Sequence, residues 1–376
     1  MNLTNKIKYS TTQKIVIALS GGIDSIVLLH YFRKHNIRVI HINHNLSSNA
    51  INWQKFCHNY CLKLGINFKA IATHIEGKNN LEEKARTLRY QLLFANIADD
   101  ELLFTAHHQS DQAETVILNL LRGSGTLGLS AMLMCGNKLH RPFLQTPKQQ
   151  IKQYASKHNL EFVDDESNLD LKFRRNFIRH KVLPLIETKY PNAEKTLSRV
   201  ADNNQQTQKL LEDLAKIDID NYNITKDILL NITNLKKLPD HRIVNILFFH
   251  LKNLNFKTPS GAIIQQIINC LDAKKDAKVL IKWSDKFEIR SFAGFLYFLL
   301  IESSHECEIL LDLRNKEGFN IKYKTNGLRI KFNHKNHSQS LKKIIQEHKI
   351  PPWEREKLKL YYIFDELVAI EKIGYL

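Results

Sequence analysis

The amino-acid sequence predicts an α/β protein whose N-terminal part is a parallel sheet with helices on both faces. The first observation is that apolar, β-branched runs of strand length alternate with segments of helical periodicity across residues 14–121. This alternation is typical of parallel strands joined by right-handed crossovers. The second is that the sequence changes character at about residue 218. We therefore expect a small, mainly helical middle domain and a small α+β C-terminal domain after the sheet.

The elements of the N-terminal domain follow in order. The first strand is expected at 14–19, and the glycine turn at 20–25 leads from it into a helix. Further strands are expected at 38–44, 68–72, 101–105 and 162–163, and further helices at 49–64, 80–98, 110–121 and from residue 146. Thr146 would cap the last helix, with Pro147 at its first position. Ligands of such sheets bind beyond the carboxyl ends of the strands, so residues 20–25, 43–44 and 106–108 are candidates for ligand binding.

The later segments set the expected domain boundaries. A polar helix at 191–217 reads as a linker between an N-terminal domain at 1–190 and a middle domain at 218–306. The middle domain contains a helix with an isoleucine stripe at 263–271 and short strands at 279–283, 287–292 and 295–301. The C-terminal domain at 307–376 is expected to contain a hairpin, 319–323 with 328–332 around Asn326-Gly327, and a helix from Ser340.

The composition favours a nucleic-acid partner. The 376 residues contain 55 Lys and Arg against 38 Asp and Glu, a formal net charge of +17. Such an excess attracts a polyanion, although a basic surface without that partner remains the alternative. No apolar run reaches membrane-spanning length and the N-terminus lacks a signal-peptide core, so we expect a cytoplasmic protein. Five scattered cysteines form no Cys-X-X-Cys pair and are interpreted as reduced thiols.

The turn Ser20-Gly21-Gly22-Ile23-Asp24-Ser25 carries the strongest chemical signal. Two glycines allow close backbone approach, and the helix that follows presents free N–H groups to an anion. The turn is not a Walker loop, because Asp24 stands where that motif has its lysine. An aspartate beside phosphates requires a divalent cation or an ammonium group between them. The hexapeptide resembles the pyrophosphate loop of enzymes that split ATP into AMP and pyrophosphate; the alternative is a glycine turn without a ligand.

A second polar cluster follows the expected strand at 101–105. His107, His108, Asp111 and Glu114 could be metal ligands, with Asp111 and Glu114 on one helix face. We favour hydrogen bonds that hold the turn over a zinc site for the histidines. The acids could hold Mg²⁺ or act as a base, and a solvated helix face is the alternative for Glu114. The glycines of the 122–126 turn are interpreted as a helix C-cap rather than a phosphate contact.

Several motifs in order resemble one family. They are SGGIDS at 20–25, HINHNL at 41–46, ARTLRY at 85–90, TAHHQSDQAET at 105–115, RGSG at 122–125, DESN…RRNFIR at 165–179 and LKKIIQEHKIPPWER at 341–355. Together they resemble the tRNA(Ile)-lysidine synthetases over most of the chain, most weakly in the middle domain. This chain departs from the family pattern in three places. Ser110 replaces the first of two adjacent acids, so that only Asp111 remains; the hairpin lacks the usual basic glycine-glycine element; and the segment after Trp353 differs.

The resemblance implies a fold, an activity and partners. The fold would be adenine-nucleotide α-hydrolase-like. The activity would be ligation of free lysine to carbon 2 of the wobble cytidine of a CAU-anticodon tRNA(Ile). An adenylated cytidine would be the intermediate, and ATP would be split to AMP and pyrophosphate. Lysidine formation would convert decoding from AUG to AUA. ATP, Mg²⁺, lysine and this tRNA are the implied ligands.

The resemblance also implies roles for single residues. Ser20, Gly21, Gly22, Ile23, Asp24 and Ser25 would bind ATP, with Asp24 holding Mg²⁺ or the incoming ammonium group. Asp111 would be the base or a second Mg²⁺ ligand, and Arg86 and Arg179 would join the catalytic set. The expected tRNA-binding residues are Arg89, Arg174, Arg175, Lys342, Lys343 and Arg355. A surface salt bridge is the alternative for each arginine.

Three other functions remain as alternatives. A tRNA thiolase could use the same loop, but such enzymes commonly need paired cysteines. A small-molecule amidating ligase would not need the charge of +17. A non-catalytic tRNA-binding module would not need Asp24 and Asp111.

Overall fold

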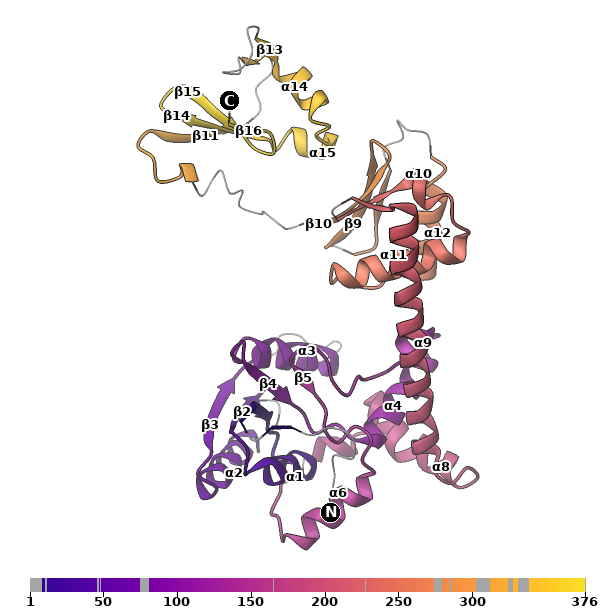
Figure 1. Ribbon diagram of the computed structural model, residues 1–376. Coiled ribbons are helices and arrows are strands. Elements are labelled where there is room, and N and C mark those ends of the chain that lie inside the picture. The colour runs from indigo at the N-terminus through magenta and orange to yellow at the C-terminus, as the bar shows by residue number, and fades with distance from the viewer. Residues whose placement is uncertain are drawn as a thin grey trace. The chain divides into compact units, whose positions relative to one another are not determined.

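The computed structural model describes residues 9–10, 12–45, 47, 49–74, 81–164, 166–226, 228–273, 279–284, 286–301, 312–323, 327–330 and 338–375. The chain divides into two compact units, Met1–Leu210 and Leu211–Leu376. Figure 1 shows an α/β first unit and a second unit made of two sheet-containing parts. No helix in the described residues is both long and apolar enough to cross a membrane.

The first unit contains a five-stranded parallel sheet. Its order is β3 (Asn67–Ala72), β2 (Ile37–Asn43), β1 (Lys14–Ala18), β4 (Glu101–Phe104) and β5 (Leu139–His140). Every neighbouring pair is parallel, which confirms the predicted sheet. Ile17 is the register partner of Phe104, so β1 and β4 end side by side. The two-residue β5 was not expected, because so short a strand carries no periodicity.

Helices cover both faces of this sheet, as predicted. Before α9, the helices of the first unit are α1 (Ile23–Phe32), α2 (Ala50–Lys63), α3 (Leu81–Phe94), α4 (Gln109–Leu120), α5 (Thr126–Leu129), α6 (Lys148–Lys157), α7 (Arg174–Phe177) and α8 (Leu183–Glu187), and α1, α2, α3 and α6 pack on the sheet. Ile15 and Ile17 of β1 belong to the core that contains α1, α2 and α6. Val16 points to the other face and packs with Leu93 of α3. The period-two alternation of strand side chains thus builds a core on each side.

Three details of the first unit differ from expectation. Helix α6 begins at Lys148, with Pro147 as N-cap and no side-chain cap, so Thr146 is not the cap. The Thr146 carbonyl instead accepts from the Gln109 backbone N–H at 3.1 Å. Residues 162–163 form no strand; Val163 instead donates its backbone N–H to the Gly21 carbonyl at 3.0 Å. Helix α3 ends at Phe94, before the expected residue 98.

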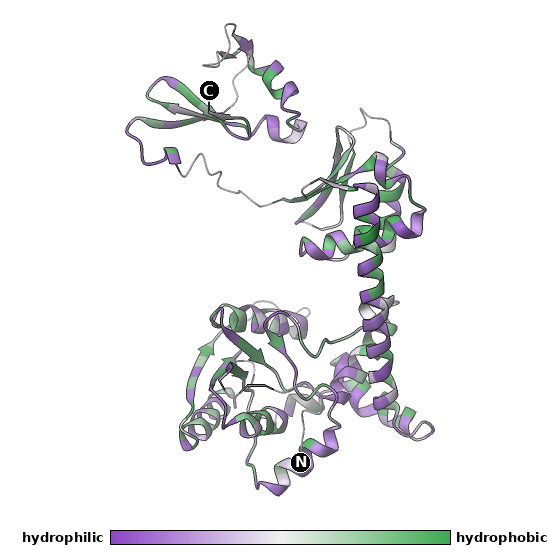
Figure 2. Ribbon diagram, viewed as in Figure 1, coloured by the Kyte–Doolittle hydropathy of each residue, from purple (hydrophilic) through white to green (hydrophobic). Residues whose placement is uncertain are grey.

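The long helix α9 (Ala193–Tyr222) covers the expected linker and is mostly polar (Figure 2). After it, the middle part combines α10 (Ile232–Leu235), α11 (Asp240–Asn253) and α12 (Gly261–Cys270) with an antiparallel sheet. The sheet order is β6 (Thr225–Lys226), β7 (Leu229–Asn231), β10 (Phe295–Leu300), β9 (Phe287–Phe292) and β8 (Leu280–Lys282). Ile264 and Ile267 of the predicted stripe lie in its core.

The C-terminal part corrects the predicted hairpin. Strand β11 (Phe319–Tyr323) pairs with β14 (Lys359–Ile363), in a sheet completed by β15 (Glu366–Ile370) and β16 (Gly374–Tyr375). Strand β12 (Arg329–Ile330) pairs with β13 (Gln339–Ser340) instead of β11. Asn326 lies outside the described residues. Ser340 caps α14 (Leu341–Glu347) as expected, and α15 (Pro352–Arg355) follows.

Candidate active site

The predicted site residues of the first unit meet where the strand order reverses. From β1 the chain moves to β2 on one side and later to β4 on the other. The turn at 20–25 follows β1, and Thr105 to His108 follow β4. Ligands of open α/β sheets bind in the crevice at this switch point.

The glycine turn is held in shape by Ser25. Its Oγ accepts hydrogen bonds from the backbone N–H groups of Ser20 at 3.2 Å and Gly21 at 3.1 Å, and donates to the Gly22 carbonyl at 2.9 Å. Gly21 has a φ of +92°, and a Cβ there would lie 2.8 Å from Val163 Cγ2. Helix α1 begins next, at Ile23, and its first N–H groups lack partners within the helix. The turn therefore presents a preformed, electropositive backbone to an anion.

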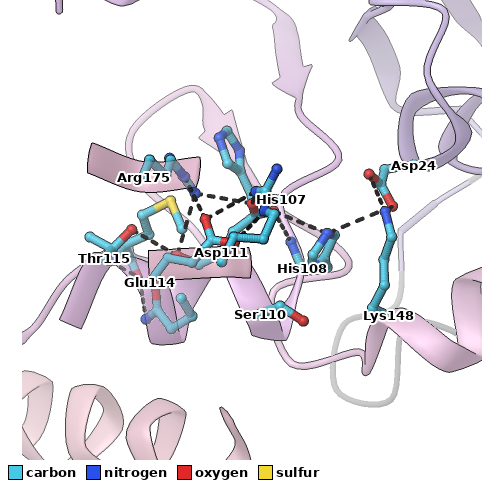
Figure 3. A network of polar contacts seen from close by, with 12 residues as sticks. Asp24, His107, His108, Ser110, Asp111, Glu114, Thr115, Lys148 and Arg175 are labelled. Carbon is cyan, nitrogen blue, oxygen red and sulfur yellow. Dashed lines mark hydrogen bonds and ion pairs between the residues drawn. The ribbon is translucent and has the colours of Figure 1, made fainter. Parts of the chain in front are cut away.

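Asp24 is paired with a lysine that was not predicted from the sequence. Lys148 Nζ lies 2.5 and 2.7 Å from the two carboxylate oxygens of Asp24 (Figure 3). His108 Nε2 lies 3.7 Å from Asp24 Oδ1 and 3.5 Å from Asp111 Oδ2, so its ring stands between the two carboxylates. Lys148 is 124 residues from Asp24, and the only signal in its neighbourhood was the start of a helix.

The two histidines after β4 shape the turn. His107 Nδ1 lies 2.9 Å from Thr105 Oγ1, and the His108 backbone N–H donates to Asp111 Oδ2 at 2.9 Å. Within the described ranges, no three His, Cys, Asp or Glu side chains gather in a way that could hold a metal ion. The hydrogen bonds of His107 and His108 support the interpretation that the two histidines hold the turn. Gly123, just past α4, has a φ of +72°, which is consistent with the expected helix C-cap.

Asp111 and Glu114 of α4 bind two arginines. Arg175 Nε donates to Glu114 Oε2 at 2.6 Å, and its Nη2 lies 3.0 Å from Asp111 Oδ1. Arg179 Nε donates to Glu114 Oε1 at 2.6 Å, and its Nη2 lies 3.1 Å from Asp111 Oδ1. The two arginines lie four residues apart, in α7 and in the π-helical turn Ile178–Val182. Glu114 is fully buried, so its predicted alternative, a solvated helix face, is wrong.

This network fixes the charge of Asp111. Burial by itself would raise the pKa of Asp111, but His108 and Arg175 outweigh burial and hold the pKa well below its usual range. Asp111 Oδ1 accepts from both arginines, and Oδ2 accepts from the His108 backbone N–H. A carboxylate in these surroundings stays ionised and is a weak base.

Ser110 is hydrogen-bonded to a further acid, Glu194. Its Oγ donates to Glu194 Oε2 at 2.5 Å, from α4 to the first turn of α9. Burial raises the pKa of Glu194, partly offset by the Ser110 hydrogen bond. This pair was not predicted from the sequence, because 84 residues separate its members.

The remaining predicted residues differ in position. The Arg86 guanidinium lies 5.4 Å from the Tyr90 ring centroid. The pKa of His107 is lowered to about 3, mainly by burial, which Asp111 opposes and to which Arg141 and Arg86 add; Arg86 is thus among the charges that act on His107. Arg89 and Arg174 are exposed. Lys342 and Lys343 are exposed on α14, and Arg355 Nε donates to the Ile350 carbonyl at 2.9 Å; all three belong to the second unit.

Comparison with known proteins decides the family. A chain from Legionella pneumophila (strain Lens), named tRNA(Ile)-lysidine synthase, is 36% identical over 400 residues, covering 96% of this chain and 91% of that protein. The chain belongs to the tRNA(Ile)-lysidine synthase family. The namesake from Coxiella burnetii is 34% identical and covers 98% of this chain and 91% of its own length. The one from Wigglesworthia glossinidia brevipalpis is 38% identical, with 80% of both chains covered.

Family models divide the chain in the same order as its fold. A PP-loop domain matches residues 1–186, a TilS substrate binding domain 230–297 and a TilS substrate C-terminal domain 319–375. Among solved structures, the U34-tRNA thiolase NcsA from Methanococcus maripaludis matches with a TM-score of 0.45 and 17% identity, over 54% of this chain and 75% of that chain. That similarity is too low to argue from, whereas membership of the tRNA(Ile)-lysidine synthase family rests on nearly the whole length.

Proposed function

We propose that this protein is an ATP-dependent ligase that joins lysine to carbon 2 of the wobble cytidine of a CAU-anticodon tRNA(Ile). The observation that carries the proposal is the presence of both TilS substrate domains behind a PP-loop domain in one chain. A PP-loop alone would fit many ATP users. The charge of +17 supports an RNA substrate. We also propose that the protein acts in the cytoplasm, as its substrates require.

The chemistry explains why ATP is needed. The oxygen on carbon 2 of cytosine is a poor leaving group, and its adenylation releases pyrophosphate and makes AMP the group that departs. The lysine amine then attacks carbon 2. A free lysine side chain has a pKa near ~10.4, so a carboxylate must orient or deprotonate the ammonium group. In this proposal the backbone of 20–25 binds the phosphates, and Asp24 receives either a Mg²⁺ ion or the amine.

Asp111 suits a positioning role better than the two roles expected from the sequence. Both of its oxygens already accept hydrogen bonds, from two arginines and from a backbone N–H. We propose that it holds His108 against Asp24 and that Arg179, which is about one-third exposed, reaches the α-phosphate or the anticodon. Arg175 is mostly buried against Glu114, and we propose that it supports the site instead of contacting tRNA.

A magnesium ion fits Asp24 better than Asp111. Mg²⁺ in such sites takes one or two carboxylates together with substrate phosphates. The Asp24 side chain is 28% exposed and lies in the loop that receives the phosphates, whereas the side chain of Asp111 is 12% exposed and enclosed by its partners. When bound, the ion would neutralise phosphate charge; the residue that would hold it is Asp24.

Two of the five cysteines are unsuited to sulfur transfer. Cys57 and Cys61 are fully buried in the core of the first unit, and burial raises the pKa of each thiol to about 12. Such thiols are inert at neutral pH. Cys307 lies outside the described residues.

Incorporation of radiolabelled lysine into tRNA tests the proposal. The wild-type protein, given ATP and MgCl₂, should label a CAU-anticodon tRNA(Ile) transcript. Transcripts with another base at the wobble position, and reactions without ATP, are the controls. Labelling must also release one AMP per lysine joined. Absence of label in the CAU transcript at saturating ATP would refute the proposed function.

A further inference from the structure

Lys148 forms an ion pair with Asp24, the carboxylate that the proposed chemistry needs. Its ammonium group contacts both oxygens of Asp24, at 2.5 and 2.7 Å (Figure 3). Neither side chain is sealed from solvent: Lys148 is 29% and Asp24 28% exposed. An incoming cation or amine would therefore compete with Lys148 for these oxygens, and Lys148 would move away if it lost that competition. The pair is open enough for a ligand to cause that movement.

The backbone of Lys148 is fixed beside the turn while its side chain is free to change partners. Helix α6 packs on α1 through Ile151, Tyr154 and Ala155, all buried in the same core. The segment just before it is tied to α4 by the bond from Gln109 N–H to the Thr146 carbonyl. A lysine has a flexible four-carbon stem that ends in a compact charge. Its ammonium group can therefore shift by several ångströms while α6 stays in place.

The turn itself lacks a cationic side chain. The sequence 20–25 contains an aspartate and no lysine or arginine. Phosphates held by its backbone would be repelled by Asp24 unless a positive charge lies close. Lys148 is such a charge, and it is already in contact with Asp24.

We propose that Lys148 is a triphosphate-binding residue that exchanges partners when ATP binds. In the ligand-free protein its ammonium group neutralises Asp24. When ATP enters, the group transfers to the β- and γ-phosphates, and Asp24 becomes free for a cation or the lysine amine. The inference rests on the ATP-splitting part of the proposed function and assigns the residue that senses the pyrophosphate moiety.

Binding of inorganic pyrophosphate and of AMP to the full-length protein, followed by calorimetry, tests this. Lys148→Met keeps most of the stem and removes the charge. We expect it to weaken pyrophosphate binding at least ~10-fold, the scale of one charged hydrogen bond, and to leave AMP binding unchanged. Lys152→Met is the matched control, because Lys152 lies one turn further along α6 and is exposed. It should bind both ligands as the wild type does.

Unaltered or tighter pyrophosphate binding by Lys148→Met would overturn the proposal, because the lysine would then only neutralise Asp24. If Lys148→Met does not fold, the double variant Asp24→Asn/Lys148→Met is compared with Asp24→Asn, since neither leaves Asp24 charged and unpaired. The same loss of pyrophosphate affinity is expected between those two. Pyrophosphate binding requires neither tRNA nor lysine, so a failed lysine-incorporation assay refutes the proposed function without deciding this one.

Discussion

Asp24 is the residue on which the proposed chemistry depends most directly. It lies in the phosphate turn, and it contacts Lys148 and His108. Replacing Asp24 by Asn keeps its size but removes the charge that would orient the lysine amine. We expect lysidine formation to fall by at least ~10²-fold, the scale of acid–base contributions, while tRNA binding is retained. Full lysidine formation by both Asp24→Asn and Asp111→Asn would show that the carboxylates are assigned wrongly.

Gly21 is the residue whose replacement tests the shape of the turn. Its φ of +92° and the 2.8 Å approach of Val163 Cγ2 leave no room for a side chain. Gly21→Ala should lower the free energy of unfolding by about 1–3 kcal/mol, the cost of one strained backbone position. At Gly22 a Cβ would make only ordinary contacts, at 3.7 Å or more, so Gly22→Ala is the matched control. Urea unfolding of both variants measures the difference, and equal stability would contradict the geometry.

At the scale of elements, α4 is joined to α7 and the π-helical turn by a buried charge network. Glu114→Gln leaves Arg175 and Arg179 with Asp111 as their remaining carboxylate in this network. Breaking a buried pair by removing one partner typically costs 3–5 kcal/mol, and we expect about 3 kcal/mol in urea unfolding. Asp100→Asn removes the exposed Lys14–Asp100 pair and should change little. A loss as small as that of the control would mean that the network is not needed for stability.

Helix α9 is joined to α4 by Ser110 and Glu194, and this contact predicts a pH dependence. Burial raises the pKa of Glu194 above its ordinary 4.5 in the folded state. The folded protein then binds more protons than the unfolded chain between these two pKa values, so this group lowers stability as pH rises through that window. Glu194→Gln should remove this slope. Between pH 5 and pH 7.5, the unfolding midpoint of the variant should rise relative to that of the wild type. A difference in midpoint that stays constant would contradict the raised pKa of Glu194.

The same elements show which features a sequence can predict. Strands β1 to β4 of the parallel sheet and the helices α1, α2, α4 and α9 were predicted because periodicity and glycine turns are local properties. The prediction of a hairpin was wrong because Phe319–Tyr323 pairs with Lys359–Ile363. The choice between two possible partner strands depends on packing across the C-terminal sheet. The site shows the same division. Asp24 and Asp111 were found from sequence motifs. Lys148 contacts Asp24, and Glu194 contacts Ser110, only in the folded chain, because the members of each pair are far apart in the sequence.

For the whole molecule, the net charge of +17 predicts how tRNA binding responds to salt. Each neutralised phosphate releases counterions, so a protein that neutralises about six phosphates loses ~10³-fold in affinity between 50 and 200 mM salt. Lys342 and Lys343 are exposed at the start of α14 and are the proposed tRNA-binding residues of the second unit. Lys342→Gln/Lys343→Gln should lower the slope of log affinity against log salt by about one for each phosphate that is no longer neutralised.

The control for this experiment is Lys63→Gln, since Lys63 is 73% exposed on α2 of the first unit and is not one of the predicted tRNA-binding residues. It changes the net charge by one without altering a proposed tRNA-binding residue, so its slope should match that of the wild type. An equal decrease in both variants, per charge removed, would mean that the tRNA responds to overall charge alone. A decrease confined to the α14 variant would instead identify α14 as part of the surface that binds tRNA.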